Sequence, residues 1–323
     1  MKPTPSASTT PLPPTPTSPP MPTAHPCESV NLDVDQLRPA VTLLVDQSGS
    51  MAQGYPSFDS PQTRWSTVRQ ALLDPTTGVV KSLQQSLQFG LTFYTSHNGF
   101  SGGACPLLSE VRSATGNYAS IAALYDQTWP DDDTPTGPAI TQVVKEIQRS
   151  GRQGPELILL VTDGEPDTCT VPDPQMGQPE ALGAAAAAHD AGIGFYVLGV
   201  GTDISESKLQ ELANAGQGKR VDAQWGVDAD AAEPFRASLD VAGLTAQLLG
   251  ILARVPLCEV LLDRDVSQDE MIRGRVAVDG RQLAYQSPDG FRLLDPRHLQ
   301  IVGQACDSLR ASGKRVTVRI SCD

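Results

Sequence analysis

Two apolar runs, each followed within two residues by an aspartate, limit what this chain can fold into more than any other feature. The first is Val41–Val45, followed by Asp46, and the second is Leu157–Val161, followed by Thr162 and Asp163. Strands buried on both faces are apolar throughout, and such strands occur in parallel sheets covered by helices. The two runs therefore predict a parallel sheet with carboxylates at the carboxyl ends of its strands.

From residue 37 to residue 255, short apolar runs alternate with longer segments of helical period. This alternation predicts an α/β domain with a doubly wound, mostly parallel sheet. The further strands expected are 89–95 and 195–200, with an antiparallel edge strand at 110–115. The helices expected are 64–73, 137–149, 180–191, 206–215 and 239–254.

After Pro256 the apolar period shifts towards two, which is typical of strands with one buried face. Residues 256–323 are therefore expected to form a small β-rich module, with a hairpin turn at Asp279-Gly280 and a short helix at 306–311. A module of this size needs disulfides or docking on the larger domain for its stability.

Residues 1–36 are expected to form a disordered tether. The first 26 residues contain ten prolines and nine serines or threonines, a composition that cannot bury a core. An inert leader fits this composition equally well. The start of the chain has no apolar segment of the kind found in secretory signals, so export is expected to use another route or a signal that is missing from this sequence.

The charge balance excludes some partners. The net charge is -13, which opposes binding to nucleic acid or to an anionic membrane surface. No run of apolar residues is long enough to span a bilayer, so no transmembrane segment is expected. An acidic protein of this kind favours cations or basic surfaces as partners.

Oxygen-bearing side chains follow the first apolar run at alternate positions. Asp46, Ser48 and Ser50 supply one carboxylate and two hydroxyls. Hard cations such as Mg²⁺ and Mn²⁺ prefer oxygen ligands, so these three residues predict one corner of a metal site.

Two other loops supply matching oxygens. Asp163 lies in a Thr-Asp-Gly turn after the second apolar run, while Thr134 and Thr136 precede the helix expected at 137–149. The loops that leave the carboxyl ends of neighbouring parallel strands converge on one crevice, so these side chains are expected to meet. The acidic run 131–133 could form a second cation site, although a solvated loop is the simpler interpretation.

These motifs resemble the von Willebrand factor type A (VWA) family, whose members carry a metal-ion-dependent adhesion site. The family pattern has D-x-S-x-S after the first strand, a threonine before a helix, and an aspartate in a T-D-G turn. The positions that match the pattern are Asp46, Ser48, Ser50, Thr134 and Asp163. Thr134 is preferred because the family's threonine lies six residues before the first large apolar residue of the helix, here Ile140. Thr136 remains the alternative.

The resemblance covers roughly residues 38–254 and implies a Rossmann-like fold that holds Mg²⁺ or Mn²⁺. It also implies a coordination position left open for the carboxylate of a protein partner. The expected function is therefore divalent-cation-dependent binding to a protein ligand that presents an acidic residue. Trp129-Pro130, just ahead of the threonine loop, could contribute an aromatic contact at the rim, with simple packing as the alternative.

No catalytic constellation accompanies these motifs, so the chain is not expected to be an enzyme. The sequence contains no G-x-S-x-G, H-E-x-x-H or G-x-x-x-x-G-K-[ST] motif. Four histidines share no recognisable spacing: His25, His97, His189 and His298.

Six cysteines, none in a C-x-x-C pair, indicate three disulfides and an extracytoplasmic location. Cys105 and Cys169 follow two strands whose loops leave the same end of the sheet, so they are expected to pair. Resemblance to family members that tie their ends together implies Cys27 with Cys258, which leaves Cys306 with Cys322. The pair Cys258 with Cys322 stays open as an alternative.

A second function remains possible at this point. Similar domains serve as regulatory or assembly subunits of metal-chelatase or AAA-type ATPase systems inside the cell. The cysteines and the proline-rich tether favour the extracytoplasmic binding module over this alternative.

Overall fold

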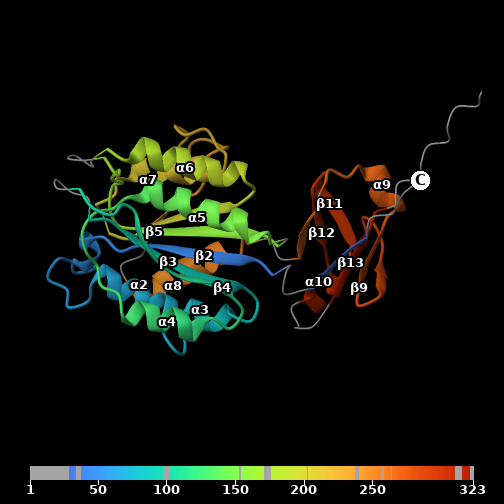
Figure 1. The fold of residues 1–323 in the computed structure, drawn as a ribbon, viewed down its shortest axis with the longest axis horizontal. Helices are drawn as coiled ribbons and strands as arrows, with labels where there is room; N and C mark the ends of the chain where they lie inside the picture. Colours follow the sequence, from blue (N-terminus) through green and yellow to red (C-terminus); the bar gives the residue numbers. More distant parts are fainter. Residues whose placement is uncertain are drawn as a thin grey trace, which may run out of the picture.

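The structure is a computed structural model in which two units can be recognised, a larger layered unit and a smaller β unit (Figure 1). Of the tether predicted at 1–36, residues 1–28 and 34–36 lie outside the residues that the structure describes. Those residues are 29–33, 38–97, 102–152, 154–170, 176–201, 203–236, 240–255, 258–262, 264–309 and 315–320.

A six-stranded sheet forms the centre of the larger unit. Its strands are β2 (Ala40–Asp46), β3 (Gln88–Thr95), β4 (Leu107–Ala114), β5 (Glu156–Thr162), β6 (Gly194–Gly199) and β7 (Phe235–Arg236). They lie in the order β4-β3-β2-β5-β6-β7, and only the edge strand β4 is antiparallel to its neighbour. Every residue of β2 and β3 is buried, which explains their uninterrupted apolar character. The predicted doubly wound fold is confirmed.

Helices cover both faces of this sheet (Figure 1). One face carries α5 (Thr136–Ser150), α6 (Gln178–Asp190) and α7 (Glu206–Gly216). The other face carries α2 (Arg64–Leu73), α3 (Val79–Leu83), α4 (Tyr118–Asp126) and α8 (Val241–Leu252). The sequence did not predict α3 and α4, because α3 is only five residues long and α4 is a short, largely apolar segment without a clear helical period.

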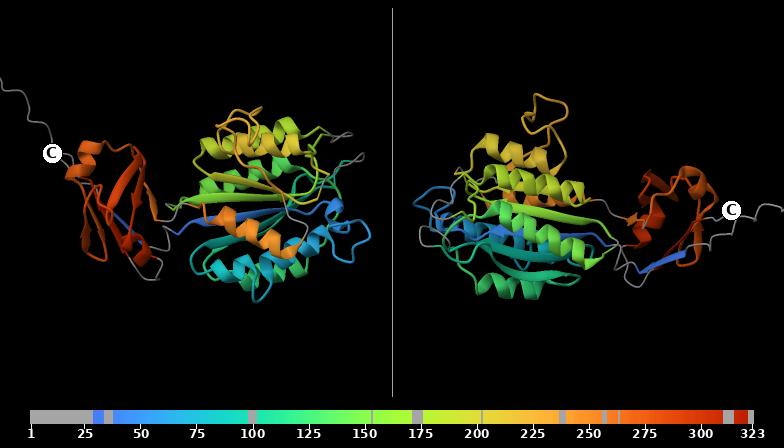
Figure 2. Two further views of the ribbon diagram at one scale, coloured as in Figure 1. Left: turned by 180° about the vertical axis from the view of Figure 1, so that it is seen from behind. Right: turned by 45° about the horizontal axis from the view of Figure 1, so that its top comes forward.

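The carboxyl ends of β2 and β5 lie at the edge of the sheet that points away from the smaller unit (Figures 1 and 2). The short helix η1 (Gly49–Ala52) follows β2 directly at this edge. The loops that carry the predicted metal ligands therefore gather at the free end of the larger unit.

The smaller unit contains two antiparallel sheets around a core of its own. Its elements are β1 (Ser29–Asp33), β8 (Glu259–Leu261), α9 (Gln268–Arg273), β9 (Arg275–Val278), β10 (Arg281–Leu283), β11 (Phe291–Asp295), β12 (His298–Ile301), α10 (Gln304–Leu309) and β13 (Arg315–Arg319). Asp279 and Gly280 join β9 to β10 with φ of 49° and 81°, as a two-residue hairpin of primed type requires. The β-rich character predicted for the end of the chain is confirmed.

Strand β1 corrects the expectation that residues 1–36 are entirely a tether. It pairs antiparallel with β13, with Ser29 opposite Arg319 and Asp33 opposite Arg315. The segment alternates polar and apolar residues, but it is short and adjoins the proline-rich stretch. Its partner strand lies at the other end of the chain, so no local pattern could reveal the pairing.

One expected disulfide pairing is present and the others are wrong. Cys105 is bonded to Cys169, as expected, whereas Cys258 is bonded to Cys306. Cys258 immediately precedes β8, and its carbonyl accepts a hydrogen bond from Ile301, so the sheet brings it beside α10. The pairs Cys27–Cys258, Cys306–Cys322 and Cys258–Cys322 are thereby excluded. Cys27 and Cys322 themselves lie outside the described residues.

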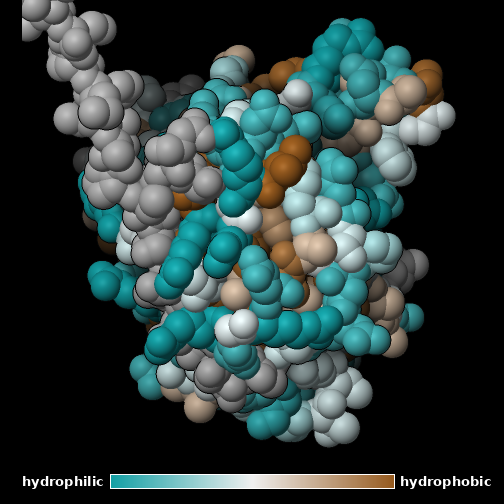
Figure 3. Space-filling model, turned by 90° about the vertical axis from the view of Figure 1, so that its right-hand side faces the viewer, coloured by the Kyte–Doolittle hydropathy of each residue, from teal (hydrophilic) through white to brown (hydrophobic). Residues whose placement is uncertain are grey.

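The end face of the smaller unit is largely hydrophilic, with a few apolar side chains near its middle (Figure 3). Ile272 and Leu294 are large apolar side chains that this unit exposes. In the parts of the chain that the structure describes, no helix combines the length and hydropathy needed to cross a bilayer.

Candidate metal centre

Asp46, the last residue of β2, lies at the base of the candidate site. Its Oδ1 accepts a hydrogen bond from the backbone N–H of Ser48 at 2.8 Å, and its Oδ2 accepts one from Thr162 Oγ1 at 2.6 Å. Burial, together with the charge of Asp163, raises the pKa of Asp46 to about 7. A cation at this position would stabilise the charged carboxylate, because it offsets the cost of burial.

The two serine hydroxyls lie on the same side of the loop after β2. The tight turn of η1 brings Ser48 Oγ to 3.0 Å from Ser50 Oγ. Ser50 Oγ in turn donates a hydrogen bond to Asp163 Oδ1 at 2.7 Å. The loops after β2 and β5 therefore meet through a hydroxyl and a carboxylate oxygen.

Thr134 reaches the same place from the loop before α5. Its backbone N–H donates to Asp167 Oδ2 at 3.1 Å, and the backbone N–H of Asp167 donates to the Thr134 carbonyl at 2.8 Å. A Cβ atom at Gly164 would lie 3.7 Å from Thr134 Oγ1 and 3.8 Å from Ser50 Oγ. Glycine at this position thus leaves space between the two hydroxyls.

The hydroxyl of Thr136 is used elsewhere. It lies 3.3 Å from the hydroxyl of the buried Tyr94 and 3.3 Å from the Thr134 carbonyl, to which it donates. Of the two threonines that the sequence offers, Thr134 is the one whose hydroxyl lies beside Gly164.

The acidic run 131–133 lies against the loop after β2. The backbone N–H of Asp131 donates to the Gln47 carbonyl at 2.7 Å, and that of Gly49 donates to the Asp132 carbonyl at 3.0 Å. Asp132 Oδ2 also lies 2.6 Å from His97 Nδ1. Within the described ranges, no group of three or more His, Cys, Asp or Glu side chains could hold an ion. The backbone of the acidic run contributes these hydrogen bonds to the loop after β2.

Trp129 lies at the rim of the site. Its carbonyl accepts a hydrogen bond from Gln47 Nε2 at 2.9 Å, and its side chain is 71% exposed. The indole is therefore not part of the core, and the backbone of Trp129 is bound to the loop that carries Asp46, Ser48 and Ser50.

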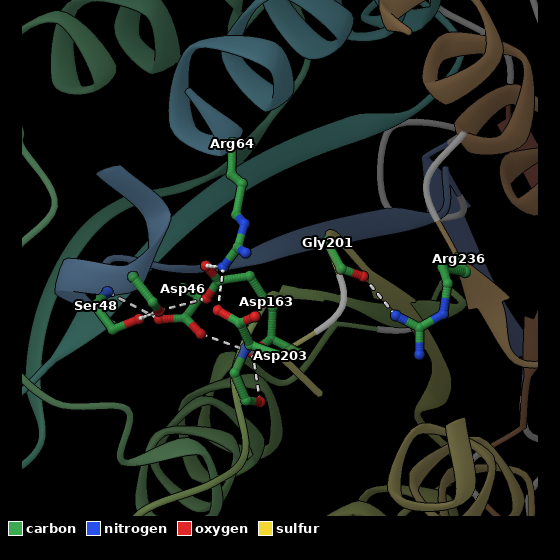
Figure 4. Close-up of polar contacts among 10 residues, drawn as sticks. Asp46, Ser48, Arg64, Asp163, Gly201, Asp203 and Arg236 are labelled. Atoms are coloured by element: carbon green, nitrogen blue, oxygen red, sulfur yellow. Dashed lines mark hydrogen bonds and ion pairs between the residues drawn. The ribbon is translucent and has the colours of Figure 1, made fainter. Parts of the chain in front are cut away.

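Arg64 is a member of the site that the sequence analysis did not single out. Its Nη1 donates to Asp163 Oδ2 at 2.6 Å and to Asp203 Oδ2 at 2.8 Å (Figure 4). The Arg64 side chain is 7% exposed and that of Asp163 is fully buried, whereas that of Asp203 is 41% exposed. Burial raises the pKa of Asp163, and the hydrogen bonds from Arg64 and Ser50 oppose this rise.

The start of α2 fixes the position of Arg64. Thr63 caps the helix by accepting a hydrogen bond from the backbone N–H of Ser66, which makes Arg64 the first helical residue. The next residue, Trp65, packs its ring 4.7 Å from that of Phe93 and 4.4 Å from that of Tyr125. The Tyr125 hydroxyl also donates to the Trp65 carbonyl at 3.1 Å, so the backbone beside Arg64 is anchored in the core.

Gly201 lies directly against the guanidinium of Arg64 (Figure 4). It has φ of 84°, and a Cβ atom there would be 2.7 Å from Arg64 Nε. The Gly201 carbonyl accepts a hydrogen bond from Arg236 Nη1 at 2.5 Å, and Arg236 Nη2 donates to the Ile204 carbonyl at 3.0 Å. The loop after β6 is thus held against Arg64, and it also supplies the Asp203 carboxylate that accepts a hydrogen bond from the guanidinium.

The donor set fits a hard divalent cation. It offers two buried carboxylates and three hydroxyls from three loops, with no sulfur or imidazole among them. Oxygen donors of this kind suit Mg²⁺ and Mn²⁺ better than softer ions.

The sequence profile of the von Willebrand factor type A domain matches residues 40–224, which is more than half of the chain. The chain belongs to the VWA family. The matched segment begins with β2 and contains all five residues of the donor set.

Several solved structures resemble this VWA protein at low sequence identity. The open conformation of the pilus adhesin SpaC from Lactobacillus rhamnosus GG is 14% identical, with a TM-score of 0.49, and covers 90% of this chain and 40% of SpaC. The chain thus spans less than half the length of SpaC. No curated protein sequence matches the chain.

Two other structures also resemble the VWA protein. Manganese-loaded TRAP protein from Plasmodium vivax is 17% identical, covering 78% of this chain and 89% of that one, with a TM-score of 0.46. A von Willebrand factor type A protein from Catenulispora acidiphila is 13% identical, with a TM-score of 0.43. The match covers 92% of this chain and 66% of the Catenulispora protein.

The sequence analysis did not identify three residues of the site: Arg64, Asp167 and Asp203. These residues form hydrogen bonds with partners on other loops, and the D-x-S-x-S pattern does not include them. One signal was available for Arg64: it begins the first helix after the metal loop, so its side chain starts near the carboxyl edge of the sheet. Nothing in the local sequence distinguishes Asp203 from a solvated loop residue.

Proposed function

We propose that the VWA domain binds Mg²⁺ or Mn²⁺ and, through the ion, the carboxylate of an acidic residue on a protein partner. The ligands proposed are Asp46, Ser48, Ser50, Thr134 and Asp163. The observation that carries this proposal is the hydrogen bond from Ser50 Oγ to Asp163 Oδ1, at 2.7 Å. This hydrogen bond joins the loops after β2 and β5, and the hydroxyl of Thr134 lies close to it, beside Gly164.

The balance of charge supports a carboxylate as the partner group. Two of the five proposed ligands are charged and three are neutral hydroxyls. A dication held by these five ligands would keep a net positive charge and would therefore attract a further anionic oxygen. This attraction is the chemistry that the bound ion would supply. Trp129, exposed at the rim, offers an apolar contact beside that carboxylate.

The proposed role is binding and not catalysis. His97, the histidine nearest to the metal loop in the described part of the chain, has a half-exposed side chain that contacts Asp132. Among the residues that the structure describes, its ring has no hydrogen bond to a serine, threonine or cysteine that it could activate as a nucleophile. The net charge of -13 also argues against nucleic acid as the partner.

The disulfides support an extracytoplasmic location. Cys105–Cys169 and Cys258–Cys306 are bonds of a kind that persists in oxidising compartments. Counting free thiols in protein isolated from its native host tests this part of the proposal. At least two intact disulfides, Cys105–Cys169 and Cys258–Cys306, are expected. Six free thiols would favour an intracellular subunit of an ATPase or chelatase.

Isothermal titration calorimetry with MgCl₂ and MnCl₂ tests the metal site directly. The wild-type protein should bind one ion per chain, and Asp46→Ala should not bind. Pull-downs with the wild-type protein in Mg²⁺ and in chelator, with Asp46→Ala in Mg²⁺ as a control, then test the partner. Equal recoveries in all three arms would reject the metal-mediated contact.

A further inference from the structure

We infer that Arg64 is a fixed internal counter-charge that weakens cation binding at the site and holds Asp163 in position when no ion is bound. This inference rests on the metal site proposed above, because it concerns the affinity of that site. It assigns Arg64 a positioning role, since the guanidinium carries no lone pair that could ligate a cation.

The two oxygens of the Asp163 carboxylate accept hydrogen bonds from different residues. Oδ2 accepts from Arg64 Nη1, while Oδ1 accepts from Ser50 Oγ. Arg64 therefore turns Oδ1 towards the serine hydroxyls without occupying it. The same Nη1 also donates to Asp203, so the guanidinium is held from two sides.

The charge of Arg64 opposes a dication at the ligands. Without Arg64, the site would present two buried negative charges, from Asp46 and Asp163. A fixed positive charge at about 6 Å from a dication weakens binding by roughly tenfold even with near-aqueous screening, and by more in a drier site. In the ion-free protein Arg64 also stabilises the ionised Asp163, which further lowers the gain from binding an ion.

Arg64 has little freedom to move away when an ion binds. Gly201 lies so close that a single added carbon would be 2.7 Å from Arg64 Nε. Trp65 anchors the backbone on the other side, and Arg236 holds Gly201 in place. The positive charge therefore stays beside the ligands in both states of the site.

Asp203 offsets part of this charge from the solvent side. It is 41% exposed, so its effect is screened by water and is smaller than that of Arg64. Removal of its charge leaves Arg64 less compensated, which should weaken cation binding several-fold.

Calorimetric titration of the full chain with MnCl₂, and separately with MgCl₂, tests the inference at one pH and salt concentration. Arg64→Gln and Arg64→Met remove the charge and should each bind Mn²⁺ roughly tenfold more tightly than wild type. Arg64→Lys keeps the charge and should stay within about threefold of wild type. Asp203→Asn should bind more weakly.

The outcomes separate this inference from the proposed function. A purely structural role for Arg64 predicts weaker binding in both neutral variants, because Asp163 would lose its orientation. If wild type binds Mn²⁺ and both neutral variants bind it equally well or more weakly than wild type, the inference about Arg64 is wrong. The proposed metal site would still stand in that case. Absence of binding in wild type and in both neutral variants overturns the metal site as well.

Thermal melting supplies a second readout that does not depend on a partner. In chelator, Arg64→Met should melt at a lower temperature than wild type, because Asp163 is left buried without its guanidinium. Excess Mn²⁺ should narrow this gap, because tighter binding gives the variant a larger ligand-linked stabilisation. A gap that stays constant or widens with Mn²⁺ would contradict the inference.

Discussion

Cys105 and Cys169 are bonded to each other across the carboxyl edge of the sheet. Cys105 belongs to the loop between β3 and β4, and Cys169 belongs to the loop after β5. Strands β3 and β5 are the two neighbours of β2, so the disulfide joins loops from both sides of the strand that ends in Asp46. The covalent link therefore limits how far the two walls of the candidate site can separate.

Removal of this disulfide should weaken both folding and metal binding. The bond closes a loop of 64 residues, and its loss in Cys105→Ser/Cys169→Ser should cost roughly 4 kcal/mol of unfolding free energy on a chain-entropy estimate. The affinity for Mn²⁺ should also fall, because the loops lose their mutual restraint. Urea unfolding and calorimetric titration measure the two effects.

The second disulfide provides a matched control. Cys258–Cys306 closes a loop of 48 residues within the smaller unit, so its removal should cost a similar free energy. It lies in a different core from the metal ligands, so Cys258→Ser/Cys306→Ser should leave Mn²⁺ affinity unchanged. Equal losses of affinity in both double variants would refute a specific effect on the site.

Asp46→Asn should abolish the stabilisation of the protein by Mg²⁺ or Mn²⁺. The substitution removes a buried negative charge that an ion would neutralise, while it keeps the size of the side chain. Differential scanning fluorimetry with and without MnCl₂ would show a rise in melting temperature for wild type and none for the variant. Asp131→Asn is the matched control on the neighbouring exposed loop, and it should retain the rise.

Thr134→Val and Thr136→Val should differ in their effect on the metal. Thr134 Oγ1 lies beside Gly164 and the serine hydroxyls, whereas Thr136 contacts Tyr94. We expect Thr134→Val to weaken Mn²⁺ binding at least tenfold, with little change in stability in chelator. Thr136→Val should lower the melting temperature in chelator and leave the affinity near that of wild type. The reverse pattern would make Thr136 the ligand.

Glu156 should make the stability of the larger unit depend on pH. Its side chain is 12% exposed, and burial raises its pKa from 4.5 to about 7, although Arg152 at 2.7 Å acts in the opposite direction. The folded protein therefore holds a proton that the unfolded chain releases near pH 4.5. The contribution of Glu156 to stability is complete below pH 4.5, the pKa of this residue in the unfolded chain. It is lost as the pH rises through about 7, its pKa in the folded protein.

Glu156→Gln should remove this dependence. Between pH 4.5 and pH 7.5 the unfolding free energy of wild type should fall relative to that of the variant, by up to about 3 kcal/mol. Urea titrations of both proteins across this range measure the difference. A wild-type stability that rises relative to the variant over the same range would show that the ion pair with Arg152 outweighs burial.

The sequence predicted those parts of the fold and site that depend on local pattern. β2 and β5 were evident because their burial on both faces demands continuous apolar residues. The helix at Arg64–Leu73 was predicted with its observed bounds from its helix-compatible pattern after the first strand, and the structure shows that Thr63 caps it. Asp46, Ser48 and Ser50 were recognisable because they belong to one contiguous motif.

The features that the sequence did not predict depend on contacts between distant residues. Arg64 meets Asp163 from 99 residues away, and nothing local marks this arginine as buried. Cys258 could have paired with any cysteine of the smaller unit, and only the folding of that unit around a common core brings Cys306 to it. Thr134 could be preferred over Thr136 only through the resemblance to the VWA family.

The pairing of β1 with β13 has a consequence for the order in which the protein forms during synthesis. Residues 29–33 form the first strand that the structure describes, but their partner strand, 315–319, is the last one and is synthesised after all the others. All six strands of the larger sheet emerge before β13, so that unit can fold while β1 still waits for its partner. The smaller unit is then the last to form, because its sheet pairs the first and the last strands that the structure describes, after the larger domain has folded.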